Sequence, residues 1–327
     1  MCRGVAQPGS VLAWGASGRP FKSARPDQYR VLSAETKRIS STQHVTRELP
    51  QAALFVPDGP MRILITNDDG IHSPGLTALA KALSKVGEVW VVAPDRERTA
   101  AAHAVTLHKP LRVQQRGARV YAVSGTPVDC VNLAVLKLLP APPDLLVSGI
   151  NKGVNLGDDV LYSGTVSAAM EGTILGVPSM AVSQEGQEHF HFDAGARYAV
   201  RIARLILKEG LPDETLVNLN IPNRPFGSIT GVRVTCLSRR RFDNPIIEKI
   251  DPHGRTYYWI AGIRVSWSRS KDADHEALEQ GAVSLTPIHL DTTNHAVLDR
   301  FRKWETVRRP NVRRVIASSK LKGKRRN

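Results

Sequence analysis

Two adjacent aspartates, Asp68 and Asp69, follow a short apolar run and precede a glycine, Gly70. The run, residues 63–66, is β-prone and ends in a turn signal, which is typical of a buried parallel strand. Ligands of open α/β sheets bind at the carboxyl ends of such strands, so the two carboxylates lie where chemistry is expected. Neighbouring carboxylates repel each other unless a cation neutralises them, and their oxygens suit hard metals such as Mg²⁺ or Mn²⁺. The alternative is an aspartate-rich turn that caps the next helix.

Three further polar loops follow predicted strands or open a helix. They are residues 93–99, 148–155 and 162–169. A doubly wound sheet brings such loops to the edge at which its parallel strands end. Oxygen ligands would come from Thr99 and Asn151, and backbone N–H groups at the start of the third loop's helix could bind phosphate.

From residue 61 the sequence alternates between strand-like and helix-like segments. The expected strands are residues 63–66, 88–93, 144–149, 179–183 and 216–221, and the expected helices are residues 75–86, 128–139, 163–175 and 194–208. Residues 111–113 and 119–124 are expected to form a hairpin or edge pair. Because helices separate most strands, we expect an α/β fold with a Rossmann-like, largely parallel sheet and helices on both faces.

The alternation ends after residue 221. Residues 232–236 and 256–260 resemble strands beside a polar arm, at about residues 236–262, whose turn is residues 252–254. A β-arm of this kind often pairs subunits, and a solvated surface hairpin is the alternative. Residues 294–304 are expected to form a last helix.

The net charge of +15 is concentrated at the two ends of the chain. Residues 1–60 carry +4 and residues 300–327 carry +11, so residues 61–299 are neutral overall. A basic face for duplex binding across the fold is therefore not expected. Three scattered cysteines without metal-ligand spacing favour a reducing, cytoplasmic setting, and no apolar run is long enough to span a membrane.

Residues 1–60 show no clean period for a helix or a strand. Parts of this segment resemble a transfer-RNA gene read in frame, and Met61 immediately precedes the first strand. We expect residues 1–60 to be an over-extended start or a disordered extension. Residues 61–305 are expected to form the α/β domain, and residues 306–327 a basic tail.

Several separate motifs carry a family resemblance. They are MRILITNDDGIHSPGLTALA and VVAPD within residues 61–95, followed downstream by SGTPVDCV, SGINKGVNLG, YSGTVSAAMEG and SLTPIH. From about residue 61 to residue 301 the chain resembles the SurE family of survival-protein nucleotidases. The resemblance implies a Rossmann-like core, a C-terminal arm and helix used in oligomerisation, and metal-dependent release of phosphate from nucleoside monophosphates.

The resemblance also assigns roles to residues. It implies that one divalent cation per subunit, Mg²⁺ or Mn²⁺, is held by Asp68, Asp69, Thr99 and Asn151, and that Asp68 and Asp69 are catalytic. Thr99 stands where the family usually has serine, and its methyl group stiffens the side chain. Two alternatives stay open: Asp68 could act as a nucleophile, and Thr99 could be a helix N-cap. The residues expected to bind the phosphate or substrate are Asn67, Gly70, Ser163, Gly164 and Thr165.

The leading hypothesis is a 5′-nucleotidase that also accepts 3′-monophosphates and works as a cytoplasmic homodimer or homotetramer. Hydrolysis of short polyphosphate at the same site is a second hypothesis. A third is a non-enzymatic RNA-associated protein that uses the basic tail, for which weak RNA contact is expected.

Overall fold

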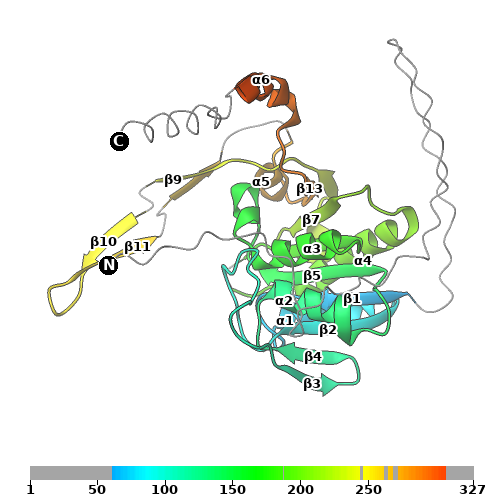
Figure 1. Ribbon diagram of the computed structural model, residues 1–327. Coiled ribbons are helices and arrows are strands. Elements are labelled where there is room, and N and C mark those ends of the chain that lie inside the picture. Colours follow the sequence, from blue (N-terminus) through cyan, green and yellow to red (C-terminus); the bar gives the residue numbers. More distant parts are fainter. Residues whose placement is uncertain (1–60, 187, 244–245, 261–263, 268–271, 307–327) are drawn as a thin grey trace, which may run out of the picture. The chain divides into compact units, whose positions relative to one another are not determined.

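The computed structural model describes residues 61–186, 188–243, 246–260, 264–267 and 272–306 (Figure 1). The expected extension over residues 1–60 and almost all of the basic tail lie outside the described residues. No helix in the described part of the chain is both long enough and apolar enough to cross a membrane.

One nine-stranded sheet has the strand order β3-β4-β2-β1-β5-β6-β7-β13-β8. The strands are β1 (Arg62–Thr66), β2 (Glu88–Pro94), β3 (Val113–Gly117), β4 (Val120–Val123), β5 (Leu145–Lys152), β6 (Ser179–Gln184), β7 (Thr215–Ile221), β8 (Val232–Val234) and β13 (Val283–His289). The six strands from β4 to β7 run parallel, whereas β3 is antiparallel to β4 and β13 is antiparallel to β7. This arrangement confirms the predicted largely parallel α/β sheet.

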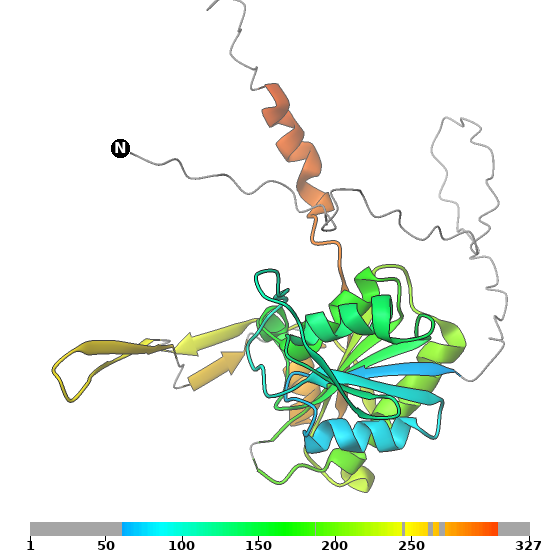
Figure 2. The same cartoon turned by 60° about the horizontal axis from the view of Figure 1, so that its bottom comes forward.

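Helices cover both faces of the sheet, as Figure 2 shows. On one face lie α1 (Pro74–Leu83) and α4 (Phe192–Glu209), and on the other lie α2 (Pro127–Leu133) and α3 (Gly164–Ile174). Strand β1 serves both layers because successive side chains of a strand point to opposite faces. Ile63 and Ile65 pack in the first layer, and Leu64 packs in the second.

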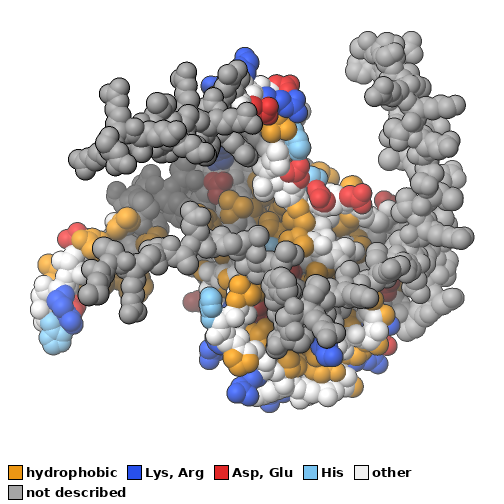
Figure 3. All heavy atoms as spheres, viewed as in Figure 1, with side chains coloured by type: hydrophobic (Ala, Val, Ile, Leu, Met, Phe, Trp, Pro, Cys, Tyr) orange, Lys and Arg blue, Asp and Glu red, His pale blue; other side chains and the backbone are white. Residues whose placement is uncertain are grey.

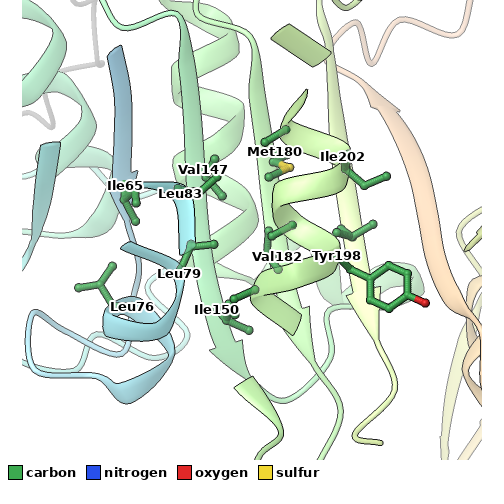
Figure 4. Packing of buried hydrophobic residues seen from close by; sticks show 14 of the residues in the cluster. Ile65, Leu76, Leu79, Leu83, Val147, Ile150, Met180, Val182, Tyr198 and Ile202 are labelled. Atoms are coloured by element: carbon green, nitrogen blue, oxygen red, sulfur yellow. The ribbon is translucent and has the colours of Figure 1, made fainter. Parts of the chain in front are cut away.

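The first layer contains the larger hydrophobic core. Figure 4 shows Leu79 and Leu83 of α1 beside Ile65 of β1 and Val147 of β5. All four are fully buried. Burying a leucine or isoleucine side chain stabilises a fold by roughly 1.5–3 kcal/mol, so this layer fixes the position at which β1 ends.

Local sequence sets where the second layer's helices begin and end. Helix α2 starts with a capping box in which Thr126 and Asp129 exchange hydrogen bonds with each other's backbone N–H groups. Residues 134–138 continue it as a π-helical turn, so the single helix expected over residues 128–139 changes type partway along.

In the C-terminal region the strand expected over residues 256–260 is present, and the structure adds strands that the sequence did not predict. Two separate two-stranded sheets pair β10 (Ile246–Ile250) with β11 (Thr256–Ile260), and β9 (Arg240–Asp243) with β12 (Arg264–Trp267). Hydrophobic side chains are exposed on the β10–β11 hairpin, among them Ile250, Trp259 and Ile260 (Figure 3). Because almost all side chains of β10 are exposed, its sequence does not alternate between apolar and polar residues in the way that predicts a strand.

Two short helices complete the described chain. Helix α5 (Asp274–Glu279) precedes β13, and α6 (Leu298–Arg302) lies between 3₁₀ turns at His295–Val297 and Lys303–Thr306. The single helix expected over residues 294–304 is therefore three short pieces.

Candidate functional site

The strand order defines a switch point at β1. The chain leaves β1 for β2 on one side and later returns to β5 on the other side. Ligands of open α/β sheets bind in the crevice between such neighbours, at their carboxyl ends. Asp68 and Asp69 follow β1, and Asn151 and Lys152 end β5. The two loops meet, because the backbone N–H of Lys152 donates to Oδ2 of Asp69 at 3.3 Å.

Asp68 is almost completely buried, at 5 % exposed. The hydroxyl of Thr165 on α3 donates a hydrogen bond to its Oδ1. Burial raises the pKa of Asp68 to about 6; the neighbouring Asp69 carboxylate also raises it, and the Thr165 hydrogen bond opposes the rise. A cation beside the carboxylate would offset most of the cost of ionising this buried group. The environment of Asp68 is therefore one that a bound cation would stabilise.

Asp69 is less buried than Asp68, but its pKa is raised for similar reasons. Burial raises its pKa, the Lys152 backbone N–H opposes the rise, and the nearby Glu97 carboxylate reinforces it. The two adjacent aspartates thus share a region in which negative charge is unfavourable without a positive counter-charge.

Asn67 and Gly70 shape the loop that carries the two aspartates. The Asn67 amide donates to the backbone oxygen of Gly70 at 3.1 Å, and the Gly70 N–H donates to Oδ1 of Asn67 at 3.2 Å. Gly70 has φ +93°, and a Cβ there would lie 2.8 Å from the backbone carbon of Arg96. Both residues, predicted to contact substrate, therefore contact their own loop and its neighbour.

A cavity of about 470 Å³ opens at the switch point. Five of the predicted site residues line it: Asp68, Asp69, Thr99, Asn151 and Ser163. Seven residues that were not predicted complete its lining: Glu97, Ala100, Lys152, Val154, Asn155, Asp159 and Tyr162. Most of the seven lie in the polar loops that the sequence analysis singled out, at residues 93–99, 148–155 and 162–169. The sequence therefore predicted the loops of the site but not these individual side chains.

Negative charge dominates the cavity. Among the described residues that line it, Asp68, Asp69, Glu97 and Asp159 carry carboxylates, whereas Lys152 carries a positive charge. A phosphate ester is an anion and would be repelled by this surface. A divalent cation held by the carboxylates would reverse the sign of the charge at this surface.

Thr99 and Asn151 present oxygen atoms that suit such a cation. The Thr99 hydroxyl donates its proton to Oε1 of Glu97 at 2.5 Å, which leaves its oxygen able to accept a metal bond. The Asn151 amide donates to the backbone oxygen of Gly153 at 2.9 Å, so its Oδ1 is the atom that can bind a cation. The described residues contain no group of three or more histidines, cysteines or acids suited to a metal, so such a site depends on these neutral oxygens.

The loop that carries Thr99 is held in an unusual backbone conformation. Ala100 and Ala102 have φ values of 57° and 48°, a left-handed region in which a side chain costs roughly 1–2 kcal/mol. The loop is fixed to α3 by His103, whose Nε2 lies 2.7 Å from Oε2 of Glu171. A glycine at position 100 would adopt this conformation without strain.

Helix α3 directs its N-terminus toward the aspartates. Ser163 caps it, and its Oγ accepts the backbone N–H of Val166 at 3.1 Å. A Cβ at Gly164 would lie 2.9 Å from Cβ of Asp68, so only glycine allows this close approach. Thr165 is fully buried and bonded to Asp68, so it orients the carboxylate.

These features define a doubly wound α/β protein with a carboxylate pair at its switch point. The family model "Survival protein SurE" matches residues 63–244, and the chain belongs to the SurE family. The chain is 51% identical over 245 residues to "5′-nucleotidase SurE" of Pelobacter propionicus, a match that covers 75% of this chain and 99% of that protein. It is 47% identical over 246 residues to "5′-nucleotidase SurE" of Geotalea uraniireducens, with the same coverage of both chains. The crystal structure of the SurE protein from Aquifex aeolicus is 43% identical, has a TM-score of 0.70, and is matched over 75% of this chain and 99% of that one.

Proposed function

We propose that this protein is a metal-dependent nucleotidase that hydrolyses nucleoside 5′-monophosphates, and 3′-monophosphates as a second substrate class, to nucleoside and phosphate. The observation that carries the proposal is the pair of enclosed carboxylates, Asp68 and Asp69, in a cavity whose charge would otherwise repel phosphate. The nucleotidase names of relatives that are about half identical to the chain support the same activity.

One divalent cation, Mg²⁺ or Mn²⁺, would be held by Asp68, Asp69, Thr99 and Asn151. When bound, such a cation neutralises phosphate charge and lowers the pKa of a bound water. The donor set fits it, because carboxylate, hydroxyl and amide oxygens are the ligands that hard cations prefer.

The chain's own groups then position the ester. Helix α3 begins at Gly164, beside Asp68, and backbone N–H groups in the first turn of a helix can donate to phosphate oxygens. Lys152 lines the same cavity and supplies a positive charge on the β5 side. Thr165 holds the Asp68 carboxylate in one orientation, so the anionic oxygens keep a fixed geometry during the reaction.

Phosphate release from AMP, measured with and without a divalent cation, tests the proposal. We expect turnover with Mg²⁺ or Mn²⁺, loss of turnover after EDTA treatment, and recovery when metal is restored. The substitution Asp69→Asn should raise the metal concentration that gives half-maximal rate. Turnover that persists at the parental rate in EDTA would rule out the metal-dependent mechanism.

Assembly and location extend the proposal. The exposed hydrophobic side chains of β10–β11 support a homodimer or homotetramer formed through this hairpin. Light scattering on the parent and on Ile260→Lys would test it, with a smaller particle expected for the variant. A cytoplasmic setting, polyphosphate hydrolysis and RNA contact through the tail remain predictions from the sequence.

A further inference from the structure

The cavity is larger than a phosphate group requires. Its volume of about 470 Å³ lies within the range of pockets that hold whole small-molecule ligands. The aspartates and the start of α3 occupy one part of its lining, and the segment from Val154 to Tyr162 supplies another. That second part therefore faces whatever group is attached to the phosphate.

Tyr162 is the aromatic residue of this lining. It directly precedes Ser163, the N-cap of α3, and both residues line the cavity, so Tyr162 lies beside the helix end at which phosphate is expected. It is 67 % exposed although it lines a cavity, and none of the stacked ring pairs in the described chain includes it. An aromatic ring with an open face is a surface on which any nucleobase can stack.

The turn that carries Tyr162 is held firmly by the core. The Asp274 carboxylate accepts the backbone N–H of Gly157 at 2.7 Å and that of Ser238 at 3.1 Å. Gly157 has φ +52°, and a Cβ there would lie 2.3 Å from the backbone oxygen of Ser238. The ring is therefore presented from a fixed backbone, which reduces the entropy lost when a ligand packs on it.

Asn155, earlier in the same segment, is also fixed. Its backbone N–H donates to Oδ1 of Asn220 at 2.8 Å, and its Nδ2 donates to Oγ of Ser183 at 2.7 Å. These bonds tie the start of the segment to β6 and β7, strands of the central sheet. The first half of the segment is thus anchored at both Asn155 and Gly157, and its last residue directly precedes the N-cap of α3, so we expect the wall to keep its shape before substrate binds.

We propose that Tyr162 determines specificity for nucleotides by stacking on the base of the bound nucleoside monophosphate. This inference rests on the proposed nucleotidase activity and extends it to the recognition of the leaving nucleoside. Every nucleobase has a flat face on which an aromatic ring can stack. We therefore expect both purine and pyrimidine nucleotides to be accepted, with purines bound better because their ring system is larger.

The test compares AMP with ribose 5-phosphate, which has the same sugar and ester but no base. The substitution Tyr162→Ala should lower kcat/KM for AMP about tenfold or more through KM, and should leave kcat/KM for ribose 5-phosphate within about twofold. Tyr162→Phe should keep the parental ratio of the two substrates, because it retains the ring. Leu161→Ala is the matched control: Leu161 is 63 % exposed, neighbours Tyr162, and is absent from the cavity lining.

Each outcome decides between the proposal and a competing role. Equal losses on both substrates after Tyr162→Ala would show that the ring only supports the phosphate site, and an unchanged rate with AMP would show that it contacts no base. A changed particle mass in light scattering, with unchanged kinetics, would place Tyr162 at an interface between copies and overturn the proposal.

Adenosine binding, measured by calorimetry with parent and variant, gives a readout without turnover and should weaken about tenfold. A parent that releases no phosphate from either ester, yet binds adenosine through Tyr162, would refute the proposed reaction and leave the base contact standing.

Discussion

The substitution Asp68→Asn is expected to stabilise the protein when no divalent cation is bound. Burial raises the pKa of Asp68 to about 6 from an ordinary value of 3.8, so the folded chain holds the proton more tightly than the unfolded chain does. Well below the ordinary pKa of 3.8 the side chain is neutral in both the folded and the unfolded state, so its burial carries no cost of ionisation. Between about pH 4 and pH 6 the unfolded chain releases this proton while the folded chain still holds it, so stability falls as the pH rises, and the loss is complete above about pH 6.

The magnitude follows from that difference in pKa. Since one pKa unit corresponds to about 1.4 kcal/mol, ionisation of Asp68 destabilises the metal-free fold by up to about 3 kcal/mol at pH 8 and by about 1.5 kcal/mol at pH 5. An asparagine cannot ionise, and its Oδ1 can still accept the Thr165 hydroxyl. The free energy of unfolding should therefore rise by these amounts in the variant.

Urea denaturation in EDTA at pH 5 and pH 8 measures both values. Asp274→Asn is the matched control, because Asp274 is fully buried and accepts backbone N–H groups of Gly157, Ser238 and His275. In Asp274→Asn the side-chain NH₂ group would face a backbone N–H donor in place of a carboxylate oxygen. This variant should therefore lose stability at both pH values. With saturating Mg²⁺ the order of parent and Asp68→Asn should reverse, because the parent gains more binding energy. A variant that is no more stable than the parent in EDTA at pH 8 would refute the reasoning.

Three further predictions concern the metal ligands, the helix end and the tail. Thr99→Ser should keep activity within about tenfold, whereas Thr99→Val should raise the metal concentration needed for half-maximal rate; an unchanged metal requirement in Thr99→Val would remove Thr99 from the site. Gly164→Ala would place a Cβ 2.9 Å from Cβ of Asp68, so kcat/KM measured at saturating metal should fall about a hundredfold, and a parental value would show that the helix end can shift without consequence. Removing residues 308–327, which carry positive charge and no candidate site residue, should spare phosphate release while reducing salt-sensitive retention on an RNA column; a loss of turnover would place the tail in the catalytic machinery.

The sequence predicts the parallel core well because local and long-range signals agree there. The middle of a buried strand such as β1 is apolar, from Ile63 to Ile65, and the polar residues that follow the strand mark the edge at which the site forms. The roles of Asn67 and Thr165 could not be predicted in the same way. Both are polar residues near the site, yet Thr165 bonds to a carboxylate 97 residues away, and only the packing of α3 on the central sheet creates that contact.

Glu97 and Tyr162 show a second limit. Each lies in a loop that the motifs single out, but the sequence pattern does not show which side chains of these loops line the cavity. The anchor of the Tyr162 turn is Asp274, on a short helix that the sequence pattern does not predict. Likewise β10 has no buried face, so its residues lack the alternation from which a strand is recognised.

The position of a bound cation tests the central claim most directly. Crystals of the protein soaked in Mn²⁺ should show one anomalous scattering peak per chain within about 2.0–2.3 Å of carboxylate oxygens of both Asp68 and Asp69. Oxygens of Thr99 and Asn151 should complete its protein ligands. A cavity without a peak at saturating Mn²⁺, or a peak that neither aspartate touches, would contradict the metal centre on which the proposed function depends.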